Sequence, residues 1–182
     1  MYVDINITFN ESKAINSVLY VASKLQRKDF HKIFKILYFS DKEHFSLYSR
    51  PITGDTYIAM QDGPVPSKLY DIFKSVRGNG YFKDNGAFSQ YFKVVDWDII
   101  EPQREFSISS LSATDIYFLD KALSDYGGMS WDEVREKSHD YAWRNTVLNK
   151  EISFKDILLE AGENDSFISF VKEQNEFKAI FQ

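Results

Sequence analysis

The sequence predicts a mainly α-helical fold of the α+β class, with about six or seven helices and a small antiparallel β insert. Two observations support this prediction. Apolar residues recur at helical spacing through most of the 182-residue chain. Between these segments, glycines and prolines delimit short runs that are rich in β-branched and aromatic residues. The chain contains no repeat and no long linker, so we expect a single domain over residues 1–182.

Two helices are expected before the first proline. Asn10 has the side chain of an N-cap, and apolar residues follow it at helical spacing as far as Leu25. Asp29 is the corresponding cap of a longer second helix. Pro51 ends that helix, because the residue before a proline is displaced from the α region. The apolar stripe of the second helix comprises Phe30, Ile33, Phe34, Leu37, Tyr38, Phe45 and Tyr48.

A β segment and a third helix are expected after this proline. Tyr57–Met60 is a short apolar run between turn residues, and this pattern predicts a strand. We interpret Gly63–Pro66 as a stiff loop, because two prolines in four residues restrict the backbone. This loop is either part of a recognition surface or a plain lead-in to the next helix. Pro66 suits the first turn of a helix with an apolar face over Leu69–Val76, which Gly78–Gly80 ends.

The second half of the chain predicts another β segment followed by four helices. Tyr91–Ile100 is rich in β-branched and aromatic residues, so we expect one or two strands there, with Phe106–Ile108 paired to them. Ser112 and Ser130 each stand three residues before an acidic side chain, which is the pattern of a capping box. The four expected helices begin at these two serines and lie near Phe154–Ala161 and Phe167–Lys178.

Composition restricts the classes of function. The absence of cysteine excludes disulfides, thiolate metal sites and cysteine nucleophiles. No stretch approaches the ~20 apolar residues of a membrane helix, and Met1–Asn10 has no signal-peptide pattern, so we expect a cytoplasmic protein. The net charge of −5 argues against direct nucleic-acid binding. We interpret the basic residues between Lys24 and Lys35 as a solvated corner.

Asp41 is the most informative position for chemistry. It falls on the apolar stripe of the second helix, and a buried carboxylate is costly unless it is hydrogen-bonded. His44 lies on the same helix face, and Arg50 and the donors of residues 54–66 are further candidate partners. Two interpretations follow. Asp41 either fixes the segment after the second helix onto that helix, or belongs to an acid–base pair or half a metal site.

His139 introduces a metal site as an alternative. With Asp41 and His44 it offers nitrogen and oxygen ligands that would suit a divalent metal. The H-x-x-x-H and H-E-x-x-H patterns are absent, and a histidine near Trp143 is also typical of a core position. Nucleophile-elbow and phosphate-loop motifs are absent, and we interpret Asp96-Trp97-Asp98 as a strand end. We therefore expect no catalytic residue, metal or cofactor.

One set of residues has the order and spacing of a known domain. The set comprises Lys35-Ile36-Leu37-Tyr38-Phe39-Ser40-Asp41, His44, Tyr48, Arg50-Pro51-Ile52-Thr53-Gly54-Asp55, Tyr57, Ala59, Gly63-Pro64-Val65-Pro66 and Leu69-Tyr70. It closely resembles the Panacea domain, the SocA-like antitoxin domain of phage-associated proteins. The resemblance extends over about residues 14–145 through Leu111, Asp120, Tyr126-Gly127, Ser138-His139 and Trp143. Ser49 departs from it, because the family usually has glycine there. We expect residues 146–182 to form a helical C-terminal extension.

The resemblance implies that the chain is a bacterial or phage antitoxin without enzymatic activity. Members of this family neutralise a toxin encoded by an adjacent gene by binding it directly. We expect the rigid Gly63–Pro66 loop and exposed Tyr57 and Tyr70 to contribute to the binding surface. The alternative is a metal-dependent hydrolase that uses Asp41, His44 and His139. The implied signature residues, which either contact the partner or hold the fold, are Asp41, His44, Arg50, Gly54, Tyr57, Gly63, Pro64, Val65, Tyr70 and His139.

Overall fold

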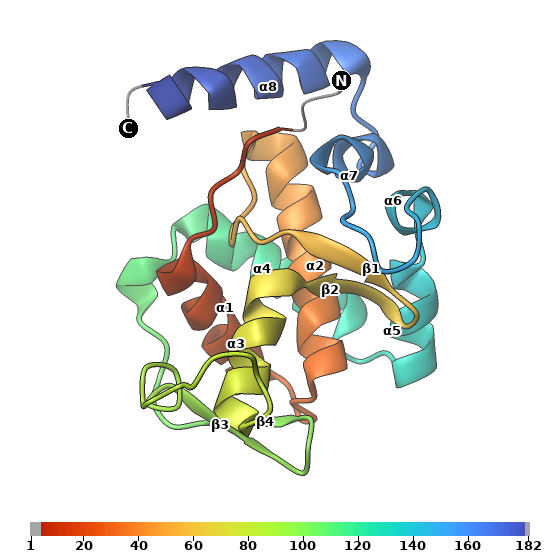
Figure 1. Cartoon of the computed structure of the whole chain (residues 1–182). Helices are drawn as coiled ribbons and strands as arrows, with labels where there is room; N and C mark the ends of the chain where they lie inside the picture. Colours follow the sequence, from red (N-terminus) through yellow and green to blue (C-terminus); the bar gives the residue numbers. More distant parts are fainter. Residues whose placement is uncertain (1–4, 181–182) are drawn as a thin grey trace.

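Eight α-helices and two antiparallel hairpins make up the computed structural model, which describes residues 5–180 (Figure 1). The predicted mainly helical α+β class is confirmed. No helix in the described part is long and apolar enough to cross a membrane. The ends of the predicted domain, residues 1–4 and 181–182, lie outside the described residues. In chain order the elements are α1 (Glu11–Lys24), α2 (Phe30–Tyr48), β1 (Tyr57–Met60), β2 (Gly63–Pro66), α3 (Ser67–Arg77), β3 (Phe92–Val95), β4 (Ile99–Pro102), a 3-10 turn (Ile108–Ser110), α4 (Ala113–Tyr126), α5 (Trp131–Ser138), α6 (Tyr141–Arg144), α7 (Phe154–Glu160) and α8 (Asp165–Ile180).

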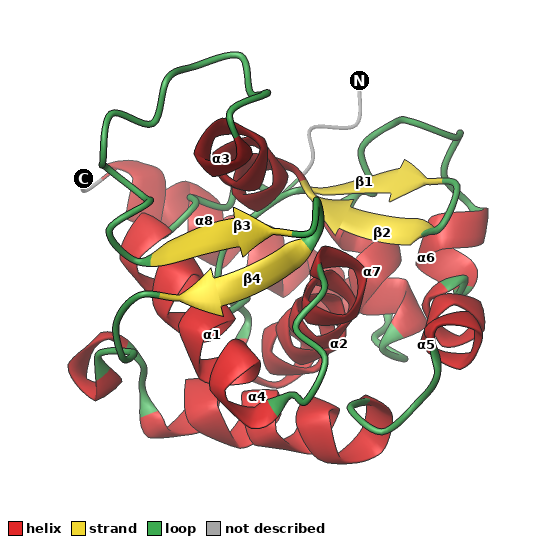
Figure 2. Cartoon of the chain, turned by 90° about the horizontal axis from the view of Figure 1, so that it is seen from below, coloured by secondary structure: helices red, strands yellow, loops and turns green. Residues whose placement is uncertain are grey.

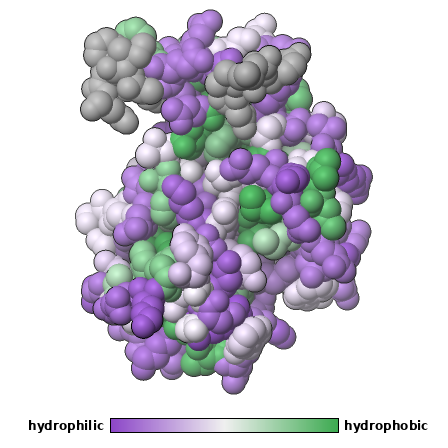
Figure 3. All heavy atoms as spheres, in the orientation of Figure 1, coloured by the Kyte–Doolittle hydropathy of each residue, from purple (hydrophilic) through white to green (hydrophobic). Residues whose placement is uncertain are grey.

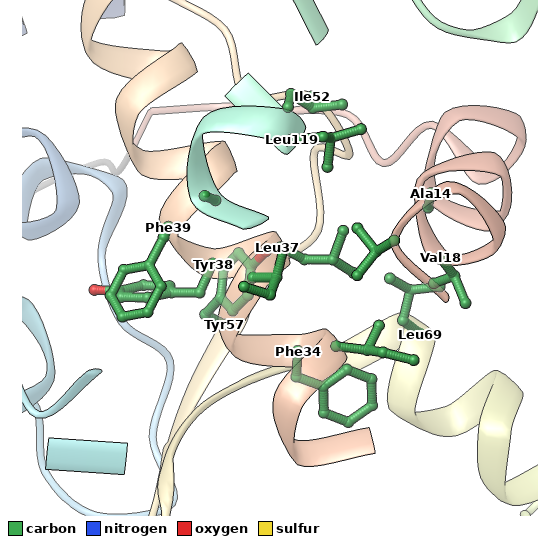
Figure 4. Close-up of a cluster of buried hydrophobic side chains, with 14 of the residues drawn as sticks. Ala14, Val18, Phe34, Leu37, Tyr38, Phe39, Ile52, Tyr57, Leu69 and Leu119 are labelled. Atoms are coloured by element: carbon green, nitrogen blue, oxygen red, sulfur yellow. The ribbon is translucent and has the colours of Figure 1, made fainter. Parts of the chain in front are cut away.

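Helix α2 forms the centre of the molecule. Figure 2 shows it surrounded by α1, α4 and α5, with α3 and the two hairpins over its remaining side. All residues from Lys32 to Asp41 are buried, so every side of this part of the helix is covered. Figure 4 shows side chains from α1, α3, α4 and β1 gathered around Leu37 and Tyr38. A helix that is apolar on most sides becomes a core helix, so α2 positions everything packed against it.

The helix ends predicted from the sequence are confirmed. Asn10, Asp29, Ser112 and Ser130 each accept a hydrogen bond from the backbone N–H three residues further on. Helix α2 ends at Ser49, whose φ of 56° lies in the left-handed region. Glycine would adopt this conformation without steric cost, whereas the Ser49 side chain does not favour it.

The β1–β2 hairpin corrects the prediction that Gly63–Pro66 is a loop. This segment is a strand paired antiparallel with Tyr57–Met60. On the other edge of β1, residues 149–152 form a third row: the Ala59 N–H donates to the Lys150 carbonyl, and the Ile152 N–H donates to the Tyr57 carbonyl. The two prolines are tolerated because they lie on the edge strand, where a missing N–H breaks no ladder.

The prediction that Phe106–Ile108 pairs with the second β segment was wrong. Strand β3 pairs instead with β4 through a three-residue turn, Asp96–Asp98, and residues 108–110 form a 3-10 turn. Asp96 and Trp97 both have positive φ, 47° and 71°, so the chain reverses here within three residues. The single turn of α6 was not predicted, because four residues are too few to show a periodic apolar face.

Candidate functional site

The signature residues predicted from the sequence do not converge on one centre. They form five separate groups around α2 and the β1–β2 hairpin. These are the pairs Asp41–Tyr57 and His44–Arg50, the group Gly63, Pro64 and His139, the pair Val65–Tyr70, and Gly54 alone.

Asp41 holds the segment after α2 against that helix. Its Oδ1 accepts the Ile52 N–H at 2.7 Å and the Thr53 N–H at 3.0 Å. Its Oδ2 accepts the Thr53 hydroxyl at 2.5 Å and the Tyr57 hydroxyl at 2.8 Å. Burial raises the pKa of Asp41, although these hydrogen bonds oppose the rise. The predicted burial and partner segment are confirmed, while Tyr57 is buried, which corrects its expected exposure.

Asp115 gathers the other polar signature residues, a role that the sequence did not reveal. His44 Nε2 and the Arg50 guanidinium each lie 3.2 Å from Asp115 Oδ1, and Lys13 from α1 pairs with Oδ2. His44 Nδ1 donates to the Arg50 carbonyl at 2.7 Å. Burial by itself raises the pKa of Asp115, but hydrogen bonds from His44, Lys13 and Ser112 outweigh it and hold that pKa well below its usual range.

The geometry gives no support to the metal-dependent hydrolase. The four donors to Asp41 occupy both of its oxygens, and both ring nitrogens of His44 contact protein groups. His139 stacks on Trp143 with ring centroids 3.7 Å apart, and burial lowers its pKa. Among the described residues, no group of three His, Asp or Glu side chains could hold a metal ion.

Two signature glycines allow close packing of backbone segments. Gly54 has a φ of 68°, and a Cβ there would collide with the Thr8 carbonyl of the N-terminal segment. Gly63 has a φ of 101°, and a Cβ there would meet the Ser138 hydroxyl and the Lys35 side chain. Both positions therefore hold the hairpin close to its neighbours, which is a structural role.

A buried lysine supports the edge of β2. Lys35 of α2 is 1% exposed, and its ammonium donates to the Pro64 carbonyl at 2.9 Å. Burial lowers the pKa of Lys35 to about 7, with nearby Asp62 opposing and Arg135 reinforcing the change. A buried ammonium with one hydrogen bond is costly, so this arrangement is a candidate for function.

An open groove lies along the N-terminal half of α2. We call it the α2 groove; it has a volume of about 430 Å³ and lies between α3, the β1–β2 hairpin and the β3–β4 turn. Figure 3 shows hydrophobic side chains gathered beside hydrophilic ones on the face that carries the β1–β2 hairpin. The lining of the groove includes Phe34, Lys35, Val65, Tyr70, Arg77 and Trp97.

A larger cleft of about 630 Å³ lies between the α1–α2 turn and the α4–α5 turn, but it lacks signature residues. Its Lys32 is directed to the carbonyls of Tyr126, Gly127 and Met129 at the end of α4, so this lysine holds two turns together. The α2 groove contains Val65 and Tyr70 and adjoins Lys35, and we therefore take it as the candidate functional site.

Comparison with known proteins identifies one family. The family model described as "Antitoxin SocA-like, Panacea domain" matches residues 33–144, which is more than half of the chain. The match runs from α2 to the end of α6 and includes Asp41, Asp115 and most of the α2 groove. No curated protein and no solved structure gives a match.

Proposed function

The chain belongs to the SocA-like antitoxin family that carries the Panacea domain, and from this membership we propose that it is the antitoxin of a two-gene toxin–antitoxin module. The proposed mechanism is stoichiometric binding of a toxin protein encoded by the adjacent gene. The family match is the single observation that carries the proposal. In this mechanism the chain acts in the cytoplasm and catalyses no reaction.

The α2 groove supports the proposal as the binding site. Val65 and Tyr70 are partly exposed on rigid elements, since β2 contains two prolines and Tyr70 follows directly in α3. A preorganised surface loses little conformational entropy on binding, and tyrosine is a frequent hot-spot residue. Asp41, Asp115 and the glycines act indirectly, because their contacts hold the hairpin and α3 in place.

Growth rescue tests this function. We expect the adjacent gene to arrest growth when expressed alone and growth to resume when this chain is co-expressed. Val65→Asp and Tyr70→Asp should abolish rescue because each places a carboxylate in the contact surface. Tyr117→Asp is the matched control, because Tyr117 is 61% exposed on α4, outside the groove. Circular dichroism and melting curves verify that all variants are folded. A neighbour that is harmless alone, or rescue without a detectable complex, would contradict the proposal.

A further inference from the structure

Trp97 combines an exposed ring with an unfavourable backbone conformation. Its φ is 71°, and 67% of its surface remains exposed at the tip of the β3–β4 hairpin. A bulky side chain at positive φ is an outlier, since the Cβ approaches the backbone. Glycine would close the same turn without this strain. The left-handed backbone conformation therefore disfavours a bulky side chain at this position, and such outliers are common at ligand-binding positions.

Arg77 lies against this ring at the edge of the α2 groove. Its guanidinium carbon is 4.0 Å from the centroid of the Trp97 ring and 5.6 Å from that of Phe30. Two of its N–H groups are used, by the Trp97 carbonyl at 2.8 Å and by the Asn79 side chain at 2.9 Å. Among the described residues, no carboxylate lies within 4.0 Å of Arg77. Unused donors of a positioned guanidinium suit a carboxylate.

The α2 groove is lined by two cationic side chains, Lys35 and Arg77, and by two carboxylates. Lys35 forms its floor, and no carboxylate of a described residue lies within ion-pair distance of the ammonium. The two acidic lining residues are Asp62 and Asp98, and Asp62 is already paired with Arg135 at 3.0 Å. The groove therefore carries no excess of either charge, and Arg77 is distinguished by its unused donors rather than by the local net charge.

We propose that the α2 groove binds a segment of the toxin in which an aspartate or glutamate stands next to an apolar side chain. This inference rests on the proposed antitoxin function and names the chemistry of the partner. The carboxylate pairs with Arg77 at the mouth of the groove. The apolar side chain contacts Trp97, Val65 and Tyr70. A free anion would gain nothing from these apolar walls, whereas a protein segment uses both features.

Three substitutions at two positions of the 182-residue chain test the groove against the purified product of the adjacent gene. Arg77→Ala should weaken binding by at least about tenfold and reduce its salt dependence, because one charge pair is lost. Arg77→Lys should retain part of the affinity. Trp97→Gly should weaken binding to a similar degree with an unchanged or higher melting temperature, because glycine tolerates the positive φ. Arg104→Ala is the matched control: Arg104 stacks on Tyr91 at 4.7 Å, outside the groove.

A double-mutant cycle identifies the carboxylate. Each Asp and Glu of the toxin is replaced by alanine and combined with Arg77→Ala, and we expect one replacement to be non-additive by about fivefold or more. Purely additive effects at every position would overturn the proposal, as would wild-type affinity in both Arg77→Ala and Trp97→Gly. If the wild-type chain itself fails to bind or rescue, the antitoxin function fails instead.

Discussion

The carboxylate of Asp41 is satisfied by four donors and by no cation among the described residues. Two of these donors are backbone N–H groups of Ile52 and Thr53, so the side chain replaces the partners that a strand would provide. Asp115 differs from Asp41, because its carboxylate contacts three basic side chains, Lys13, His44 and Arg50. The two aspartates fix the same connection, residues 49–57, from its two ends. We therefore expect Asp41 and Asp115 to affect function indirectly, by fixing the position of the β1–β2 hairpin.

Replacement of Asp41 tests its structural role. Asp41→Ala should lower the free energy of unfolding by about 3 kcal/mol or more, because two buried N–H groups and the Tyr57 hydroxyl lose their acceptor. Asp41→Asn should cost clearly less, since the amide oxygen still accepts the two N–H groups. Urea denaturation with an unchanged m-value measures both. A loss below about half a kcal/mol for the alanine variant would show that Asp41 is solvated.

At the level of elements, helix α3 depends on a cap that is remote in sequence. Pro66 at its N-cap position offers no side-chain acceptor. Asp55 replaces it: its carboxylate accepts the N–H groups of Lys68 at 3.0 Å and Leu69 at 2.9 Å. Because α3 carries Tyr70 and Arg77, Asp55 also helps to position these two groove-lining side chains. Burial raises the pKa of Asp55 to about 6, and nearby Asp41 adds to the rise. The backbone N–H groups of Leu69, Lys68 and Thr56 oppose it.

The pH dependence of stability tests this buried cap. Since the folded-state pKa lies above the unfolded value of about 3.9, the folded chain binds the proton more tightly. The associated stability is complete below about pH 4 and is lost as the pH rises through about 6. The unfolding free energy of the wild type minus that of Asp55→Asn should therefore fall by about 2 to 3 kcal/mol between pH 4 and pH 7. A difference that grows with pH would mean that the hydrogen bonds outweigh burial.

For the whole molecule, the features that could be predicted from the sequence are those that neighbouring residues determine. The caps at Asn10, Asp29, Ser112 and Ser130 and the apolar periodicity of the long helices gave the helical framework correctly. The buried, hydrogen-bonded state of Asp41 followed from its place on an apolar stripe, because only a satisfied carboxylate is stable there. These features need no knowledge of contacts between distant segments.

What the sequence did not reveal depends on long-range contacts. Strand β2 was interpreted as a loop, because its prolines conceal a pairing that the position of β1 creates. The role of Asp115 was missed because Lys13 precedes it by 102 residues, and its visible pattern was only that of a helix cap. Arg77 and Trp97 become neighbours only when α3 packs beside β3 and β4. Their spacing in the sequence carries no signal of this contact.

We propose that this chain neutralises its toxin by direct binding through the α2 groove. Calorimetric titration of the purified toxin with the full-length chain tests it most directly. We expect a saturable complex of fixed stoichiometry for the wild type and for the Tyr117→Asp control, and strongly weakened binding for Tyr70→Asp. Absence of binding by a wild-type chain that still restores growth, or equal affinity of Tyr70→Asp and the wild type, would contradict the account.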